Sequence, residues 1–135
     1  MIVLTPDDAE AFNNRGLTYD ALGDYENAIA DFDAALILRP SFAEAYSNRG
    51  AVLEMVDDTE GALKDYQLAL DTDPRLASAH YNLARLHSKN GDVASCLQHL
   101  DQMLQIAPQW VEDASQDEYL KWALDIRNIR ENRNP

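Results

Sequence analysis

Apolar residues recur at spacings of three and four along two stretches, residues 9–22 and 25–38, with polar residues between them. This is the period of an α-helix that buries one face. Gly23 and Asp24 separate the stretches, and an aspartate directly before a helix caps its free N–H groups. The pattern therefore predicts two helices joined by a short turn.

The same pattern returns with a period of 34 residues, which is the spacing of Pro6, Pro40, Pro74 and Pro108. Small residues align with small ones, and they are expected where helices cross closely: Gly16, Ala28, Gly50, Ala62, Ala84 and Cys96. The turn recurs as Asp57-Asp58 and Gly91-Asp92. Asp7 with Glu10, and Ser41 with Glu44, have the spacing of capping boxes at the starts of the first helices.

These positions resemble the tetratricopeptide repeat, whose pattern is W-x2-L-G-x2-Y, then A-x3-F, then P. The matching residues are Phe12, Arg15, Gly16, Tyr19, Ala28, Phe32 and Pro40 in the first copy, Tyr46, Arg49, Gly50, Leu53, Ala62, Tyr66 and Pro74 in the second, and His80, Leu83, Ala84, His87, Cys96, Leu100 and Pro108 in the third. The resemblance implies an all-α fold, a right-handed superhelix of antiparallel helix pairs.

The period divides the chain into five parts. Residues 9–42, 43–76 and 77–110 are expected to form three repeats. Residues 1–8 are expected to be the tail of a preceding repeat or an N-terminal cap, because Ile2, Leu4 and Pro6 match Leu36, Leu38 and Pro40. Whether the chain is a fragment of a longer protein stays open.

Residues 111–135 leave the period and are expected to form a capping helix and a frayed tail, since an array must cover its last repeat. Ser115 with Glu118 has capping-box spacing. The predicted apolar stripe is Tyr119, Trp122, Ala123, Ile126 and Ile129, and the predicted frayed stretch begins at Arg127. Leu120 and Leu124 make the helix too apolar for one stripe, which leaves self-association through this helix open.

The chain has 135 residues and a net charge of −13 at pH 7. The acidity is uneven, because residues 1–76 hold sixteen acidic and five basic residues. Such a surface disfavours nucleic acid and favours a cationic partner or simply solubility. No apolar run is long enough to cross a bilayer and no basic leader follows Met1, so a cytoplasmic location without membrane insertion is expected.

No group of residues predicts catalysis, a metal or a cofactor. His80 and His87 share a helix face but replace aromatics at packing positions, and no further cysteine or carboxylate completes a metal site. Cys96 and His99 are three residues apart, but Cys96 occupies a small buried position of the repeat. We therefore expect a structural role for these residues and no enzyme activity.

The resemblance implies that the first helix of each pair lines a concave groove. The partner-binding residues expected to be exposed there are Glu10, Asn13, Asn14, Leu17, Glu44, Asn48, Glu54, Tyr81, Asn82 and Arg85. In family members that bind extended peptides, asparagines equivalent to Asn14, Asn48 and Asn82 hold the main chain. An amide suits this task because it offers a donor and an acceptor together.

One subgroup of the family grips the carboxylate end of heat-shock chaperones with two Lys, two Asn and an Arg. The five corresponding places here are Asn13, Leu17, Asn48, Ser78 and Asn82, of which only Asn48 matches. Docking of that acidic tail is therefore not expected.

The sequence thus predicts a protein-interaction module that binds a peptide or helix of basic character in an acidic groove. Glu10, Glu44 and Glu54 favour a basic part at the first two repeats, and Arg85 and Lys89 an acidic part at the other end. Two alternatives remain, a structural array that associates through its ends and an accessory domain of a larger enzyme.

Overall fold

The structure, a computed structural model, describes residues 8–133, and every regular element in that range is a helix. The chain divides into two compact units, residues 1–76 (unit 1) and 77–135 (unit 2). Unit 1 contains α1 (Asp8–Ala21), α2 (Tyr25–Leu38), α3 (Ala43–Met55) and α4 (Thr59–Thr72). Unit 2 contains α5 (Ala77–Lys89), α6 (Val93–Ile106), the 3₁₀ helix η1 (Pro108–Trp110), α7 (Val111–Gln116) and α8 (Lys121–Arg133).

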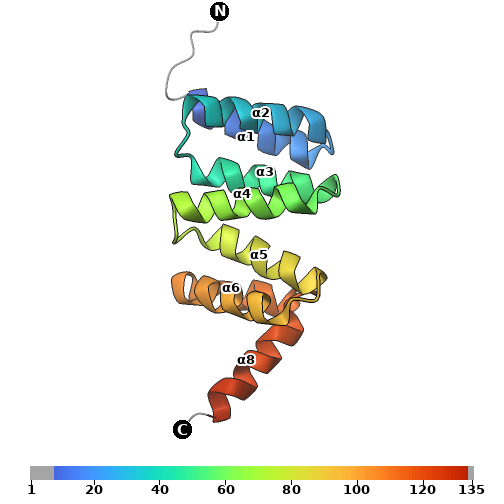
Figure 1. The fold of residues 1–135 in the computed structure, drawn as a ribbon, viewed down its shortest axis with the longest axis vertical. Coiled ribbons are helices and arrows are strands. Elements are labelled where there is room, and N and C mark those ends of the chain that lie inside the picture. Colours follow the sequence, from blue (N-terminus) through green and yellow to red (C-terminus); the bar gives the residue numbers. More distant parts are fainter. Residues whose placement is uncertain (1–7, 134–135) are drawn as a thin grey trace, which may run out of the picture. The chain divides into compact units, whose positions relative to one another are not determined.

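Helices α1 and α2 form one antiparallel pair, and α3 and α4 form a second within unit 1 (Figure 1). In unit 2, α5 pairs with α6 in the same way. The all-α fold of helix pairs is therefore confirmed. Among the described helices none is both long and apolar enough to cross a membrane. Residues 1–7, with the expected tail and the Asp7 capping box, lie outside the described range.

The caps of the second helices are confirmed. Asp24, Asp58 and Asp92 each accept a hydrogen bond from the backbone N–H three residues later, at Asn27, Gly61 and Ser95. The capping box predicted at Ser41 is wrong, because the residue before α3 is Phe42 and no side chain caps that helix. Phe42 is buried in a cluster with Ala9 and Leu36, so core packing sets this helix start.

The turn inside each pair needs a residue in the left-handed region of backbone space. Gly23 and Gly91 fill it in the first and third pairs with φ of 77° and 79°, whereas Asp57 holds φ of 64° in the second. A side chain in this conformation is strained by its Cβ, and glycine is not.

We expect Asp57→Gly to raise the free energy of unfolding by about 0.5 kcal/mol. The variant relieves the backbone strain of the folded turn, and this gain exceeds the cost of the greater backbone entropy that glycine gives the unfolded chain. Gly23→Ala is the reciprocal control, since nothing lies within 4 Å of an added Cβ and only the backbone changes. It should cost about 1 kcal/mol in urea unfolding. A lower stability for Asp57→Gly would show that the Asp57 side chain itself stabilises the turn.

The predicted small positions are buried against large aromatic rings. A Cβ added at Gly16 would lie 2.7 Å from the Phe32 ring, and one at Gly50 would lie 2.8 Å from the Tyr66 ring. Both rings are fully buried. The prediction that these glycines let the helices approach closely is confirmed.

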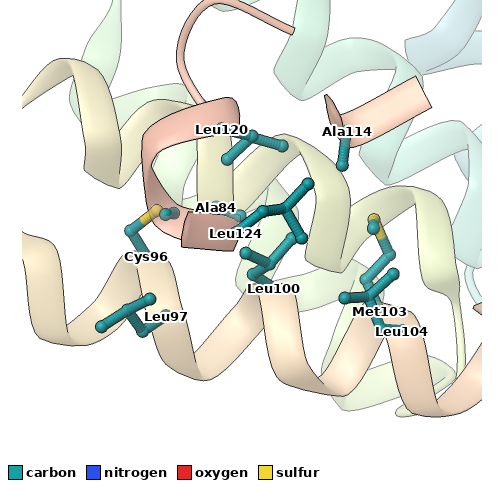
Figure 2. Packing of buried hydrophobic residues seen from close by; sticks show 10 residues of the cluster. Ala84, Cys96, Leu97, Leu100, Met103, Leu104, Ala114, Leu120 and Leu124 are labelled. Carbon is teal, nitrogen blue, oxygen red and sulfur yellow. The ribbon is translucent and has the colours of Figure 1, made fainter. Parts of the chain in front are cut away.

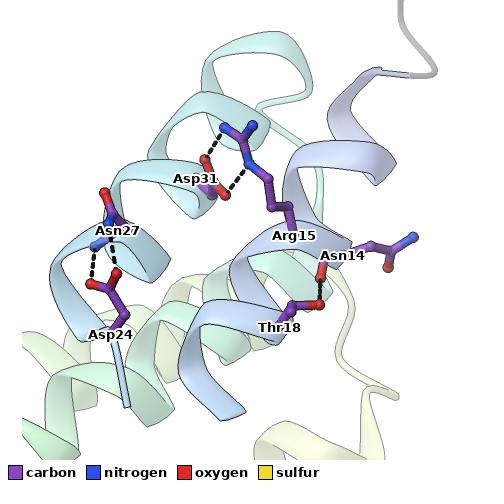
Figure 3. Close-up of polar contacts among 6 residues, drawn as sticks. All are labelled: Asn14, Arg15, Thr18, Asp24, Asn27 and Asp31. Carbon is purple, nitrogen blue, oxygen red and sulfur yellow. Dashed lines mark hydrogen bonds and ion pairs between the residues drawn. The ribbon is translucent and has the colours of Figure 1, made fainter. Parts of the chain in front are cut away.

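Arginine–aspartate pairs join the helices of unit 1. Arg15 donates two hydrogen bonds of 2.7 and 2.8 Å to Asp31 (Figure 3). Arg49 binds Asp65 in the same bidentate way and adds a 2.8 Å bond to Asp33 of α2. The aligned positions in unit 2 are Leu83 and His99, so the third pair lacks this connection.

The core of unit 2 joins α5 and α6 to the C-terminal helices. Figure 2 shows Leu120 and Leu124 pointing to the same cluster as Cys96 and Leu100 of α6. The predicted stripe on α8 is wrong in part, since Leu120 and Leu124 are buried whereas Ile129 is 55% exposed. The two leucines that did not fit the predicted stripe therefore fill the core of unit 2.

The chain turns at Asp117, which separates α7 from α8. Asp117 accepts hydrogen bonds from the backbone N–H of Tyr119 and, through its carbonyl, from those of Leu120 and Lys121. The capping box predicted at Ser115 is wrong, because Ser115 lies inside α7 and donates to the carbonyl of Glu112. The stretch from Arg127, for which fraying is predicted, is helical as far as Arg133, where α8 ends.

Candidate functional site

The predicted binding residues of unit 1 differ in accessibility. Glu10, Asn14 and Leu17 are exposed on α1, and Glu44 is exposed on α3. Glu10 and Glu44 both lie in the first turn of their helices. The accessible part of the predicted surface in unit 1 therefore presents carboxylates, an amide and one apolar side chain.

Asn13 and Asn48 bind each other. The Asn48 amide N–H donates a 3.0 Å hydrogen bond to Oδ1 of Asn13, which is only 5% exposed. The expected exposure of Asn13 is wrong, because its amide oxygen accepts a hydrogen bond from Asn48 of α3 inside the unit. Asn48 is partly buried and shares its amide with this contact, whereas Asn14 is exposed.

Glu54 is also engaged, since it accepts a hydrogen bond from the hydroxyl of the buried Tyr66. The tyrosine places its hydroxyl at the edge of the core, and the carboxylate meets it there. Glu54 therefore supports packing inside the α3–α4 pair. Its position in the 34-residue period did not indicate this role.

A hollow of about 280 Å³ lies between the ends of the helices of unit 1. Its charged lining residues are Glu10, Glu44, Asp73 and Arg39. The Arg39 guanidinium is 4.6 Å from the centre of the Phe42 ring and 3.8 Å from Glu10. Three carboxylates and one arginine thus line this hollow, which leaves a net negative charge at this surface.

Two of the predicted residues of unit 2, Tyr81 and Arg85, meet at Asp117. The Tyr81 hydroxyl donates a 2.9 Å hydrogen bond to Asp117, and Arg85 Nε lies 2.7 Å from the same carboxylate. Burial, followed by the hydrogen bond to Asp117, raises the pKa of Tyr81 to about 12. Arg85 also lies over the Tyr119 ring at 5.5 Å. Arg85 was expected to face a partner, but its charge is met inside the unit.

A second hollow, the α5–α7 hollow, has a volume of about 460 Å³. One wall is Ser78, Tyr81 and Asn82 of α5, and the other is Trp110, Asp113, Gln116 and Asp117. The Tyr81 and Trp110 rings meet edge to face at 6.1 Å. Sequence reasoning missed the second wall because residues after 110 leave the period. The one signal in the sequence was Trp110, a large aromatic residue two positions after Pro108, the last aligned proline.

Three histidines gather between α5 and α6. The Nδ1 atoms of His80 and His99 are 3.0 Å apart, and the ring of His87 stacks on that of His99 at 5.7 Å. Burial first, and then the charges of the other two histidines, lowers the pKa of His99 to about 4. Sequence reasoning paired His80 with His87 and His99 with Cys96, and it did not bring the three histidines together. The signal was that His99 aligns with Asp31 and Asp65, the partners of arginines.

The structure also describes the surroundings of the histidines and of Cys96. No group of three or more His, Cys, Asp and Glu residues in the described range is arranged to hold a metal ion. Cys96 is fully buried, and burial raises the pKa of its thiol to about 11. The thiol is therefore protonated at neutral pH and is a poor nucleophile.

Comparison with known proteins gives one consistent family. Models described as tetratricopeptide repeat match residues 9–42 and 77–109, and a model described as TPR repeat matches residues 58–91. No match was found among curated proteins.

Three solved structures similar to this chain carry the same kind of fold. One is MamA, with a TM-score of 0.74 and 22% identity over 93% of this chain and 72% of that one. The first TPR of Spaghetti (RPAP3), bound to the HSP90 peptide SRMEEVD, has a TM-score of 0.80 and 16% identity over 90% and 99%. The TPR2B domain of yeast Sti1, in a pHsp70 complex, has a TM-score of 0.74 and 25% identity over 88% and 97%.

Proposed function

The chain belongs to the tetratricopeptide repeat family, and from this premise we propose that it is a non-enzymatic interaction module whose unit 1 binds a basic segment of a partner protein. The binding surface is the exposed side of α1 and α3. The observation that carries the proposal is the hollow in which Glu10, Glu44 and Asp73 outnumber Arg39.

The charge of unit 1 supports a cationic partner. A field of one sign around a surface raises the rate of encounter with an oppositely charged segment and disfavours a like-charged one. Leu17 and Met55 are 40% and 60% exposed, and they add apolar contact on the same two helices.

The HSP90 peptide in the similar structure of Spaghetti (RPAP3) is the opposite case. SRMEEVD ends in two glutamates, a valine and an aspartate. The places that would hold its carboxylates carry no cation here, and two of them, Asn13 and Asn48, bind each other. We therefore propose a partner whose charge is reversed relative to that peptide.

Hydrogen bonds from asparagine do not suffice for this binding. Each contributes about 0.5 to 1.5 kcal/mol net, whereas micromolar affinity needs about 8 kcal/mol. With Asn48 engaged by Asn13, carboxylates and apolar contact must supply most of the affinity in unit 1.

The test reverses two charges of the surface, in the variant Glu10→Lys with Glu44→Lys. Peptides selected on the wild-type chain from a random-sequence library should be enriched in lysine and arginine. Their affinity for the double variant should fall by about tenfold or more, because cations then face cations. Isothermal titration calorimetry at low salt measures the change.

The matched control is Glu26→Lys with Glu60→Lys. These glutamates are also exposed and also lie in the first turn of their helices, but on α2 and α4. The control makes the same change in net charge and in helix-end electrostatics, and it should bind the peptides nearly as the wild type does. Equal losses in both variants would mean that only overall charge matters, and the proposed surface would be rejected.

A further inference from the structure

We propose that the α5–α7 hollow of unit 2 binds a lysine or arginine side chain of a partner protein. This site shares no residue with the surface proposed for unit 1 and is formed in part by residues outside the repeats. The proposal rests on the charge balance of the hollow, on its aromatic wall and on the contacts that hold that wall in place.

The lining contains two carboxylates, Asp113 and Asp117, and no lysine, arginine or histidine. Arg85, which does not line the hollow, pairs with Asp117, and Tyr81 and the backbone N–H of Tyr119 donate to the same carboxylate. Asp117 is therefore neutralised. Asp113 is exposed and forms no ion pair with the other described residues, so one negative charge at the hollow remains unbalanced.

The aromatic wall suits the rest of a long basic side chain. Tyr81 and Trp110 meet edge to face, and Trp110 packs against the core of unit 2. Lysine and arginine bury their methylene groups on such apolar surfaces, and their charged ends are attracted to aromatic faces. Gln116 adds an exposed amide group that can bind the peptide backbone next to the basic side chain.

The hollow is large enough and its wall is held in place. Its volume of about 460 Å³ lies within the range of roughly 300 to 1,000 Å³ of small-ligand sites. The Tyr81 hydroxyl and Arg85 Nε both contact Oδ2 of Asp117, and the backbone N–H of Tyr119 donates to Oδ1. The Asp117 carbonyl in turn holds the turn that follows α7. Little order must be gained on binding, which favours affinity.

The test uses Nα-acetyl-lysine methylamide as the probe and the indole N–H signals of ¹⁵N-labelled full chain as the readout. The chain has two tryptophans. Trp110 lines the α5–α7 hollow, whereas Trp122 lines a different hollow and donates to Ser88 Oγ, so its signal is an internal reference. The Trp110 signal should move with a millimolar dissociation constant while the Trp122 signal stays.

Two comparisons identify the chemistry. The norleucine analogue of the probe, which lacks only the amine, should bind at least fivefold more weakly. Asp113→Asn, which keeps the size of the side chain, should weaken the lysine probe by about fivefold. Equal shifts with the two probes, or an unchanged affinity in Asp113→Asn, would overturn the proposal.

Two further results separate this proposal from others. Butylammonium should bind at least threefold more weakly than the lysine probe, and equal binding would assign the hollow to free amines and overturn a peptide site. The variant Glu10→Lys with Glu44→Lys should bind the probe as the wild type does. Failure of either proposal would thus leave the other standing.

Discussion

Asp65→Ala should lower the free energy of unfolding by about 2 to 4 kcal/mol. Asp65 is 3% exposed and receives two hydrogen bonds from Arg49, which also raise the pKa of that arginine. Removal of the carboxylate leaves a partly buried guanidinium without its main partner. The loss stays below the upper limit for buried pairs because the Arg49 side chain is 23% exposed and retains Asp33.

The control for this prediction is Asp33→Ala, which removes the other partner of the same arginine. The Asp33 side chain is 50% exposed, so we expect a loss of less than about 1 kcal/mol. Urea unfolding followed by circular dichroism measures both variants. Similar losses for the two would show that burial does not govern the strength of these pairs.

Acidification should destabilise unit 2 through His99. Its pKa is about 4 in the folded chain and about 6.5 in an unfolded one. The unfolded chain therefore binds the proton first, and the stabilisation present above pH 6.5 is lost as the pH falls toward 4. After allowance for the partial exposure of the ring, we expect a loss of about 1 to 2 kcal/mol between pH 7 and pH 5.

His99→Leu is the variant that tests this origin, because Leu83 already occupies the aligned arginine position beside it. The variant should lose most of the difference in stability between pH 7 and pH 5. Tryptophan fluorescence is a suitable measure, since both tryptophans belong to unit 2. If the wild type and the variant show the same pH dependence, carboxylates elsewhere are responsible.

The sequence was sufficient to predict the helix pairs because their determinants are local and repeated. Asp24, Asp58 and Asp92 cap helices within four residues of themselves. Gly16 and Gly50 are required by rings that lie sixteen residues away in each copy. A fixed period makes such contacts readable, because each copy repeats the same neighbours.

The residues that were placed wrongly depend on contacts that the period does not contain. Asn13 was expected at the surface, but its partner Asn48 comes from the next pair. Ser115 had the right spacing for a cap, but it lies inside α7, and the next helix starts at Lys121, directly after the buried Leu120. The α5–α7 hollow was invisible for the same reason, since Asp117 meets Tyr81 only after the chain has turned.

Cys96 is the only cysteine of the chain, and it is enclosed by the core of unit 2. A sulfhydryl reagent can reach it only when that core separates. The rate of Cys96 modification in native buffer should therefore report how often the core of unit 2 opens spontaneously. This measurement of local unfolding needs no denaturant and no engineered label.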